Sequence, residues 1–479
     1  MTRGRVLSVA SECVPLIKTG GLADVAGALP AAMAAEGWDM RVLLPGYRGL
    51  SARLVAPVVI WQDPDLFGGA ARVLGGAVDG LRVLLLDAPH LFDRPGGPYS
   101  ADGKDHPDNP ERFAALCWAA AALARGGGSD GWRPDILHAH DWQGGLAPAY
   151  LRYGEPAPVR SVMTIHNVAF QGIAPAAARA ALRLPAAAFT SEGVEYYGNI
   201  STLKAGLVCA DRITTVSPTY AEELMRPEFG LGLEGVLAAR AADLSGILNG
   251  VDMAVWSPET DPEIVPYSAR DLTGKAVNRA RLIAEFGLGE VPGPLAIVVS
   301  RLTGQKGIDI LDRALGGFVA AGGGLALLGS GDPALEAAMR AAAARWPGRV
   351  AVRIGYDEAL SHRMFAGGDA VLVPSRFEPC GLTQMYGLRY GTIPLVAATG
   401  GLNDSVVGAT PASLAARAAT GVTFHPVDEI ALAGALRRLV ALHADRKAWK
   451  AIIGRAMKVD VGWGGPAKAY SSLYESLLA

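Results

Sequence analysis

The stretch Leu295-Ala-Ile-Val-Val-Ser-Arg-Leu-Thr-Gly-Gln-Lys-Gly307 decides which fold we expect for this chain. Its opening residues are all apolar, which is typical of a strand buried on both faces of a parallel sheet. A glycine turn that carries Arg301 and Lys306 follows at once. A buried strand that ends in such a polar turn is the basic unit of an α/β sheet, so the rest of the chain should repeat it.

Apolar, β-branched runs of this kind recur along the whole chain, separated by longer helical patterns. This alternation predicts right-handed βαβ units. The runs fall into two sets, so we expect an α/β fold with two doubly wound, Rossmann-like domains that face each other across a cleft. The other expected strands are Arg5–Ala10, Met40–Leu44, Leu81–Asp87, Asp135–His140, Val159–Ile165, Arg212–Val216, Leu325–Leu328, Val350–Ile354, Ala370–Val373, Ile393–Val396 and Val422–Phe424.

The length of the chain also favours two domains, because 479 residues exceed the size of a single hydrophobic core. We place the junction near Ile247-Leu-Asn-Gly-Val-Asp252, since Asn-Gly is a turn signal. The expected domains are residues 1–246 and residues 247–455. A helical segment, residues 456–479, follows and can pack back on the first domain.

The composition excludes several classes of protein. Half of the residues are hydrophobic and 19% are charged, which is typical of a globular protein, and a net charge of -2 does not favour nucleic acid or a membrane as partner. The four cysteines are far apart, so neither a disulfide framework nor a structural zinc site is expected. No targeting segment is visible, and the most apolar helical run, Phe113–Ala124, is shorter than the ~20 residues that span a bilayer. We therefore expect a cytoplasmic protein.

A lysine and a pair of glycines follow the first expected strand, in Lys18-Thr-Gly-Gly21. Glycine lets a ligand come close to the backbone, and the start of the next helix offers free amide groups and a partial positive charge. These features indicate an anion site. The alternative is an ordinary strand-to-helix loop with a solvated lysine, because the spacing matches no standard phosphate-binding fingerprint.

Two further motifs carry groups that suit a diphosphate. Arg301 and Lys306 would neutralise its charge, unless they only form surface salt bridges. In Pro374-Ser-Arg-Phe-Glu-Pro-Cys-Gly-Leu-Thr-Gln384, the segment Gly381–Thr383 would offer amide groups at the first turn of a helix. Glu378 would repel a phosphate, so we expect it to face a neutral polyol or a developing cation, or else to cap the helix.

Two strands of the first domain end in histidine motifs, His138-Ala-His-Asp-Trp142 and Thr164-Ile-His-Asn167. The pair of alternating histidines permits a metal site, but no other clustered cysteine or histidine supports one. We favour His140, Asp141, His166 and Asn167 as polar groups that line the cleft. One of the two strand histidines is then a hydrogen-bonded core residue.

These groups together fit a nucleotide-sugar. Lys18, Arg301, Lys306 and the Gly381–Thr383 turn can meet a diphosphate, while Asp141, His166 and Glu378 surround the sugar. The negative charge of the departing nucleoside diphosphate grows as its bond to the sugar breaks. Fixed cations and amide groups stabilise this charge most strongly in the transition state.

At this point the motifs resemble those of a known family. Lys18-Thr-Gly-Gly-Leu-Ala-Asp-Val25, Asn249-Gly-Val-Asp252 and the other motifs quoted above are similar, in order and over nearly the whole chain, to those of bacterial glycogen synthases and plant starch synthases. The resemblance implies a retaining glycosyltransferase of the two-Rossmann (GT-B) architecture that transfers glucose from ADP-glucose to the non-reducing 4-hydroxyl of an α-1,4-glucan and releases ADP. It also implies that no metal or other cofactor is needed.

The same resemblance implies a role for each candidate residue. Residues 1–246 would form the acceptor side with the Lys18 loop, and residues 247–455 would bind the nucleotide-sugar. Glu378 would lie near the transferred glucose, His166 over a far hydroxyl of the sugar, and Asp141 on the acceptor side. The remaining donor-binding residues would be Lys18, Gly20, Gly21, Asp24, Asn249, Arg301, Lys306, Tyr356, Cys380, Gly381, Leu382 and Thr383, of which Lys18, Arg301 and Lys306 also serve catalysis.

The chain departs from related retaining transferases at two places. Tyr386 stands where many carry a second acidic residue, eight positions after Glu378, and Ala397-Ala398 stands where a basic residue is frequent. The first departure favours front-face substitution over double displacement with a carboxylate nucleophile, although Glu378 and Asp141 remain candidates for the latter. Three other functions stay open: a non-catalytic glucan-binding protein, a UDP-glucose-dependent glucosyltransferase and an NAD-dependent oxidoreductase.

Overall fold

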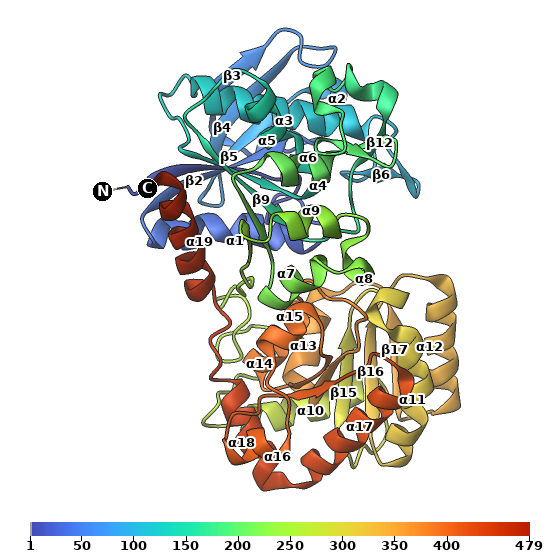
Figure 1. The fold of residues 1–479 in the computed structure, drawn as a ribbon. Coiled ribbons are helices and arrows are strands. Elements are labelled where there is room, and N and C mark those ends of the chain that lie inside the picture. The colour runs from blue at the N-terminus through green and yellow to red at the C-terminus, as the bar shows by residue number, and fades with distance from the viewer. Residues whose placement is uncertain (1) are drawn as a thin grey trace. The chain divides into compact units, whose positions relative to one another are not determined.

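The computed structural model describes residues 2–479, which form two compact units (Figure 1). Unit 1 extends to Asn249 and takes up the chain again at Trp463–Ala479, and unit 2 is Gly250–Gly462. Among residues 2–479, no helix combines the length and the apolar character that a membrane crossing requires.

Unit 1 is built on a nine-stranded sheet with the order β14-β13-β9-β8-β1-β2-β5-β4-β3. The strands from β14 to β5 are parallel, and β4 and β3 extend one edge in antiparallel fashion. The bounds are β1 (Gly4–Val9), β2 (Trp38–Pro45), β3 (Val55–Asp63), β4 (Ala71–Val78), β5 (Leu81–Asp87), β8 (Ile136–His140), β9 (Arg160–Ile165), β13 (Arg212–Thr215) and β14 (Leu244–Gly246).

The antiparallel edge formed by β3 and β4 was not expected from the sequence. Pro57 interrupts β3, and Gly75 and Gly76 interrupt β4, so neither segment has the unbroken apolar run of a buried strand. Most of β3 is exposed, which is consistent with an edge position. Gly75 is closely packed, because a Cβ on this residue would lie 2.7 Å from the Ile60 side chain.

Helices cover both faces of this sheet, and short strands and turns extend its loops. The helices are α1 (Gly21–Ala35), α2 (Pro89–Phe92), α3 (Asn109–Gly126), α4 (Asp141–Gly144), α5 (Leu146–Tyr153), α6 (Thr202–Cys209), α7 (Pro218–Leu224), α8 (Pro227–Gly230) and α9 (Glu234–Ala239), with 3-10 turns at Ser51–Arg53, Ala176–Arg179 and Ala186–Ala188. The short strands are β6 (Ser100–Ala101), β7 (Lys104–Asp105), β10 (Ile173–Pro175), β11 (Glu195–Tyr196) and β12 (Asn199–Ser201).

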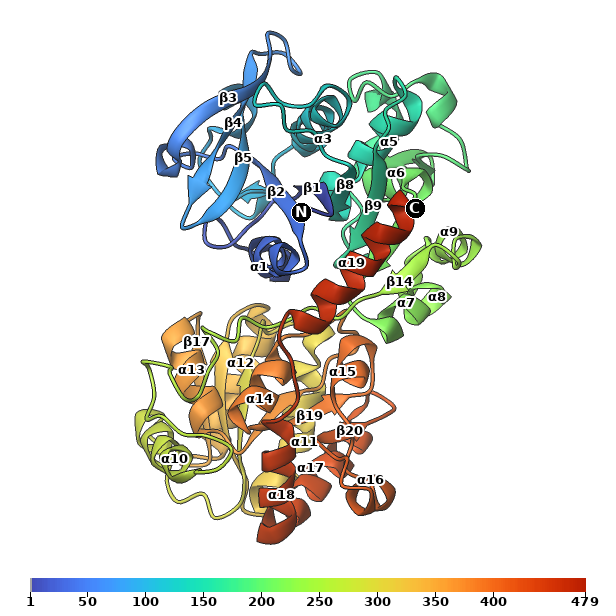
Figure 2. The same ribbon diagram turned by 90° about the vertical axis from the view of Figure 1, so that its left-hand side faces the viewer.

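The C-terminal helix α19 (Gly464–Leu478) belongs to unit 1 and packs against α1 (Figure 2). Its Tyr470 and Tyr474 join a core cluster with Trp38. The indole nitrogen of Trp38 also donates to Oγ of Ser471 at 2.9 Å. The preceding helix, α18 (Arg446–Ala456), belongs to unit 2.

Unit 2 has a fully parallel six-stranded sheet with the order β17-β16-β15-β18-β19-β20. Helix α11 packs on α17, and α10 packs on α13. The strands are β15 (Leu295–Val299), β16 (Gly324–Gly329), β17 (Val350–Ile354), β18 (Ala370–Val373), β19 (Ile393–Ala397) and β20 (Val422–Phe424). The helices besides α18 are α10 (Thr273–Glu285), α11 (Ile308–Ala320), α12 (Pro333–Arg345), α13 (Glu358–Gly367), α14 (Thr383–Tyr390), α15 (Gly400–Ser405), α16 (Pro411–Ala415) and α17 (Glu429–Ala444), with a 3-10 turn at Gly304–Lys306.

Each sheet has one point where the strand order reverses. In unit 1 the chain runs outward from β1 to β2 on one side and returns to β8 on the other, and in unit 2 it does so at β15 and β18. The loops that follow the carboxyl ends of two such strands leave a crevice, which is where α/β sheets bind ligands. The two doubly wound sheets confirm the predicted fold class and fix where the functional side chains should be sought.

Candidate active site

A pocket lies at the switch point of unit 2, between the loop after β15 and the loop after β18. Both loops carry motifs that the sequence singled out. The pocket is lined by Val299, Ser300, Lys306, Leu372, Val373, Pro374, Ser375, Glu378, Gly381 and Thr383.

Lys306 and Glu378 form an ion pair in this pocket. Lys306 Nζ lies 2.6 Å from Oε2 of Glu378, and the two side chains are only 17% and 9% exposed. The hydroxyl of Ser375 donates to the same carboxylate oxygen at 2.8 Å. Gly307, next to Lys306, has φ +67°, and a Cβ there would lie 2.0 Å from the carbonyl oxygen of Pro374. Only glycine therefore allows the two loops to come this close.

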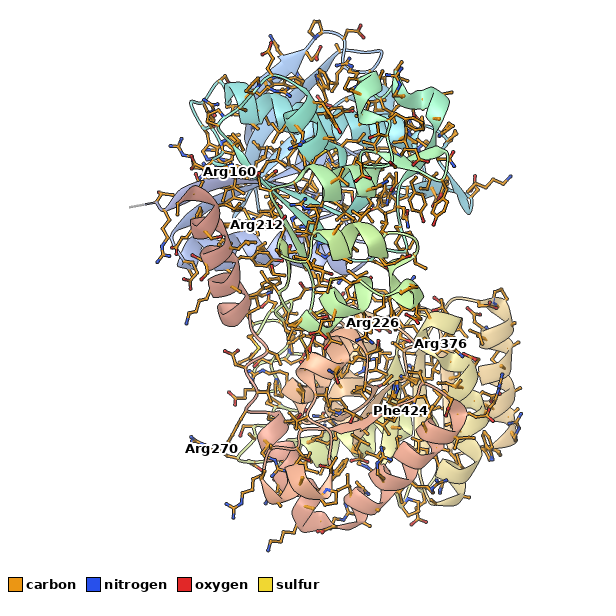
Figure 3. The ribbon with its side chains drawn as sticks, viewed as in Figure 1. Arg160, Arg212, Arg226, Arg270, Arg376 and Phe424 are labelled. Carbon is orange, nitrogen blue, oxygen red and sulfur yellow. The ribbon has the colours of Figure 1, made fainter. Side chains whose placement is uncertain are left out.

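Hydrogen bonds join the same two loops on the side of Arg376. Its amide donates to the carbonyl oxygen of Gln305 at 2.8 Å. Its guanidinium group makes two parallel bonds of 2.7 Å to the Asp309 carboxylate on α11. The Arg376 side chain is labelled in Figure 3. Such a two-point pair fixes orientation as well as distance. These hydrogen bonds thus hold together the two loops that carry Lys306 and Glu378.

The start of α14 provides backbone amide groups beside the pocket. Leu382 occupies the N-cap position and no side chain caps the helix, so the amides of the first turn have no side-chain acceptor. Gln384 is fully buried and donates to the carbonyl oxygens of Cys380 and Gly381 at 3.1 and 2.9 Å. These two bonds fix the Cys380–Thr383 turn, a role that the sequence did not reveal.

A second pair of glycines, Gly400 and Gly401, packs against the backbone of the loop that carries Glu378. The amide of Gly401 donates to the carbonyl oxygens of Glu378 and Pro379 at 3.1 and 3.2 Å. A Cβ on Gly400, whose φ is +44°, would lie 2.0 Å from the carbonyl oxygen of Glu378. This turn therefore positions the glutamate through close backbone packing.

Arg301, Tyr356 and Tyr386 do not line the pocket. Arg301 is exposed and has no ion pair among residues 2–479. Tyr356 is 77% exposed, and its hydroxyl donates to Glu358 Oε2 at 2.9 Å. The ring of Tyr386 stacks on Trp256 with centroids 3.7 Å apart, so the position eight residues after Glu378 contributes to the core around α13.

In unit 1, the Lys18 loop follows β1 and ends at the start of α1. Lys18 Nζ pairs with Asp24 Oδ1 at 2.8 Å, and both side chains remain partly exposed. A Cβ on Gly20 or on Gly21 would meet no atom within 4 Å, and neither residue has positive φ. The fold itself does not require this glycine pair, so the space that it leaves open is available to a ligand.

Glu12 fixes the Lys18 loop through hydrogen bonds, a role that was not predicted from the sequence. The carboxylate accepts hydrogen bonds from the backbone amides of Thr19 and Gly20, the latter at 3.0 Å, from the Thr19 hydroxyl and from the hydroxyl of Tyr99. It is only 3% exposed. The one available signal was a single acidic residue within the otherwise apolar stretch between β1 and Lys18.

Asp141 directly follows β8 and lies beside the end of β9. Its φ of +50° belongs to the left-handed region, where aspartate is tolerated better than most residues. Oδ1 accepts from the amides of His166 and Asn167 at 2.7 and 3.3 Å. Burial raises the pKa of Asp141 to about 7, although these two amides favour the charged form and act against the shift, and Glu12 nearby adds to it.

The three histidines of these strand ends lie close together, with His138 and His140 fully buried and His166 partly exposed. His140 Nδ1 lies 3.0 Å from His166 Nε2, and His140 Nε2 lies 3.0 Å from the Ser8 hydroxyl. Burial lowers the pKa of His138 and of His166 to about 3, and that of His140 well below its ordinary value. All three rings are therefore neutral near pH 7, so the tautomer of His166 depends on that of His140.

The structure settles which strand histidine belongs to the core. His138 is fully buried between Tyr474 and Thr164, to which its ring nitrogens bond at 2.7 and 2.5 Å. His140 is also fully buried, so the interpretation of His140 as a cleft-lining residue was wrong. Strand β8 lies inside the sheet and is covered on both faces, which leaves only the residues beyond its end accessible. Among residues 2–479, no group of three or more histidine, cysteine, aspartate or glutamate side chains could hold a metal ion.

Asn249 is the last residue of unit 1 before the chain enters unit 2. It is buried, and its Oδ1 has no hydrogen-bond partner among residues 2–479. The structure therefore collects most of the predicted residues into two groups, one at each switch point, while Tyr356 follows the edge strand β17 and Asn249 lies at the boundary of the units.

Comparison with known proteins gives matches over the whole chain. A family model described as the starch synthase catalytic domain matches residues 5–239. A glycogen synthase of Cereibacter sphaeroides (strain ATCC 17025) is 64% identical over 477 residues, which cover 100% of this chain and 99% of that protein. A glycogen synthase of Paracoccus denitrificans is 60% identical over 476 residues, or 99% of this chain and 100% of that protein.

Solved structures agree with these matches. The catalytic domain of starch synthase IV from Arabidopsis thaliana, bound to ADP and acarbose, has a TM-score of 0.88 and 31% identity, with 99% of each chain covered. Sucrose-phosphate synthase from Thermosynechococcus elongatus has a TM-score of 0.62 and 20% identity over 99% of each chain, which is a likeness of fold alone.

Two doubly wound units with polar loops at their switch points are the GT-B architecture of glycosyltransferases. Within that class, the identity and coverage of the relatives are decisive: the chain belongs to the glycogen synthase and starch synthase family.

Proposed function

We propose that this protein transfers glucose from ADP-glucose to the non-reducing 4-hydroxyl of an α-1,4-glucan, with retention of the anomeric configuration and release of ADP. The observation that carries the proposal is the Lys306–Glu378 pair, 2.6 Å apart at a switch-point pocket. It stands in a chain that is 64% identical over its full length to a glycogen synthase. The ADP and acarbose bound to the plant starch synthase support ADP as the leaving group and a glucan as the acceptor.

Unit 2 is proposed to bind the donor. Lys306 and Arg301 hold the diphosphate, and the backbone amides of the Cys380–Thr383 turn contact phosphate and sugar. The uncapped start of α14 suits this role, because free amides and the helix dipole favour a negative charge. Glu378 faces the glucose and stabilises positive charge as it develops at the anomeric carbon. Its bond to Lys306 keeps both groups in place.

Unit 1 is proposed to contribute the remaining contacts. The Lys18 loop adds a cation and open backbone at Gly20 and Gly21, where a ligand would meet no neighbouring side chain. His166 contacts a far hydroxyl of the glucose, and Asp141 serves the acceptor side. Asp24, Asn249 and Tyr356 are assigned to the donor on resemblance, with Asp24 already oriented through Lys18.

The proposed chemistry is front-face substitution. The bond between the anomeric carbon and the diphosphate oxygen breaks, and its electron pair leaves with ADP. The acceptor's 4-hydroxyl oxygen then bonds to the same face of the short-lived cationic sugar, and its proton passes to the departing phosphate. Fixed cations stabilise the growing negative charge, and each such interaction is worth about 2.7–4 kcal/mol in comparable sites. A glucosyl-enzyme trapped on Glu378 or Asp141 would show double displacement instead.

The test is transfer of radiolabelled glucose to glycogen, with ADP-glucose and UDP-glucose in parallel reactions without added metal. We expect incorporation from ADP-glucose, and digestion of the product by an α-1,4-specific amylase. Equal incorporation from UDP-glucose would contradict the assigned donor. Glucan binding without incorporation from either donor would replace the proposed transferase activity with a glucan-binding function.

We place the reaction in the cytoplasm, since none of the four cysteines forms a disulfide, which suits a reducing compartment.

A further inference from the structure

A second pocket lies at the opposite end of the unit 2 sheet. Its walls include Val291 and Pro292, which precede β15, and Asp369, which precedes β18. The candidate active site, by contrast, is built from loops that follow the carboxyl ends of these same strands. The second pocket has a volume of about 350 Å³, which is within the range of small-ligand sites.

The charged side chains of this pocket are mostly cationic. Lys275, Arg279 and Arg446 line it together with a single carboxylate, Asp369, and with His443. The carboxylate is already engaged, because its Oδ2 accepts from Arg279 Nε at 2.8 Å and from the amide of Leu295 at 2.7 Å. With His443 neutral, two arginines and the amino group of Lys275 thus face one carboxylate.

The two arginines differ in how far their donors are used. Arg279 donates through Nη2 to the carbonyl oxygens of Val291 and Gly293, both at 3.0 Å, but its Nη1 has no partner among residues 2–479. Arg446 is exposed at the mouth of the pocket and forms no ion pair with any described carboxylate; Nη1 lies 3.4 Å from His443 Nε2. The neighbouring carboxylate, Asp445, bonds instead to the amides of Lys447 and Ala448. Guanidinium donors therefore remain available on both sides of the pocket.

The pKa of His443 responds to the charged groups around the pocket. Its side chain is only 6% exposed and lies 3.9 Å from Asp369 Oδ2. Burial lowers the pKa of His443, and the charges of Arg446 and Arg279 lower it further, although Asp369 acts in the opposite direction. The charged groups that face this ring are thus two cations and one anion.

Lys275 is a buried cation in the same wall. Nζ donates to the Thr392 hydroxyl at 2.8 Å and to the carbonyl oxygen of Ala366 at 3.2 Å, and both of these acceptors are neutral. Burial lowers the pKa of Lys275 to about 7, although the charge of Asp369 acts in the opposite direction. A bound anion would offset the cost of keeping this charge away from water.

We propose that this pocket binds a small organic phosphate. A phosphate monoester carries about -1.5 to -2 charges near pH 7, which matches the excess positive charge of the wall. Arginine forks bind phosphate oxygens in pairs, as the free donors of Arg279 and Arg446 allow. The rest of the lining is apolar (Leu272, Ala276, Val291, Pro292 and Ile453), so it suits an ester with an apolar body better than inorganic phosphate.

The test compares inorganic phosphate and phenyl phosphate as probes of the full-length protein, by calorimetry and by NMR of the His443 ring. Saturating ADP is present so that the candidate active site is occupied. Phenyl phosphate should bind at least tenfold more tightly than inorganic phosphate, and it should raise the pKa of His443. Arg446→Gln should weaken binding at least tenfold. Lys447→Gln, which removes the same charge one residue away from the lining, should leave the affinity unchanged.

Three outcomes would overturn the proposal: equal affinity of wild type and Arg446→Gln, equal weakening by Lys447→Gln, or equal affinity for the two probes. Arg446 is an exposed residue at the start of α18, so its variant should fold normally. The readout is a difference between variants that lie outside the candidate active site. It therefore holds even if the proposed transfer reaction is wrong.

Discussion

The ammonium group of Lys306 lies 2.6 Å from the carboxylate of Glu378, and each side chain comes from a different loop of the unit 2 switch point. The packing of the two loops brings the two groups together. A diphosphate that binds beside Lys306 would share the lysine with Glu378, which would keep the carboxylate next to the sugar. Such preformed charges need no reorganisation during the reaction.

Replacing Lys306 and Arg301 separately should distinguish a paired cation from an unpaired one. Both Lys306→Gln and Arg301→Gln should lower kcat/KM for ADP-glucose about 10²–10³-fold, because each removes one charge from the leaving group. Only Lys306→Gln should also lower the melting temperature, since it leaves Glu378 partly buried without its partner. Steady-state kinetics and thermal denaturation measure both effects. An unchanged kcat/KM in Arg301→Gln would remove this exposed residue from the donor site.

Replacing Glu12 should loosen the Lys18 loop. Glu12→Gln keeps the shape of the side chain but points an amide group at donors such as the Gly20 N–H. Hydrogen bonds to charged groups contribute about 1.5–3 kcal/mol each, so we expect lower stability of unit 1 and a raised KM for ADP-glucose. Glu222→Gln, an exposed carboxylate of the same unit, is the matched control and should change neither quantity. If the two variants behave alike, Glu12 does not position the loop.

The two glycine pairs should respond in opposite ways to alanine. Gly401→Ala should destabilise unit 2 and lower activity, because the new Cβ would lie 2.2 Å from the carbonyl oxygen of Cys380. Gly21→Ala should leave stability unchanged or raise it by up to about 1 kcal/mol, since the site is open and begins a helix. The same change should weaken donor binding if a ligand approaches this backbone. Melting temperatures and ADP-glucose titrations check the contrast, and a stable Gly21→Ala variant with normal donor affinity would argue against a ligand there.

Asp141 predicts a specific dependence of stability on pH. Its pKa is raised to about 7 in the folded chain, so its stabilising contribution is complete below its ordinary pKa of 3.8 and is lost as pH rises through 7. Wild type should therefore lose stability relative to Asp141→Asn by about 1.4 kcal/mol per pH unit between pH 4 and 7. Urea denaturation at pH 5 and pH 8 measures this difference. Asp105→Asn, at an exposed site, should show no such trend, and a constant gap between wild type and Asp141→Asn would contradict the buried, proton-binding carboxyl.

The sequence predicted the parallel strands and the loops that carry the candidate site, because buried parallel strands leave unbroken apolar runs. It missed the edge strands β3 and β4, because a proline in β3 and two glycines in β4 interrupt their apolar runs. It also missed Glu12, Ser375 and Gln384. Glu12 and Gln384 bond to backbone groups and Ser375 bonds to the Glu378 carboxylate. These contacts form only once the loops have folded, so no motif in the sequence reveals them. His140 was misjudged because even the last residue of β8 is covered on both faces of the sheet.

The central claim is that the Glu378 carboxylate beside Lys306 serves the transfer step itself. The most direct measurement compares wild type and Glu378→Gln for two quantities: the dissociation constant of ADP and the rate of labelled glucose transfer from ADP-glucose to glycogen. We expect ADP affinity to stay within about threefold of wild type and transfer to slow at least 10²-fold, since we propose that Glu378 acts on the sugar and not on the diphosphate. A Glu378→Gln variant that transfers glucose at nearly the wild-type rate would contradict it.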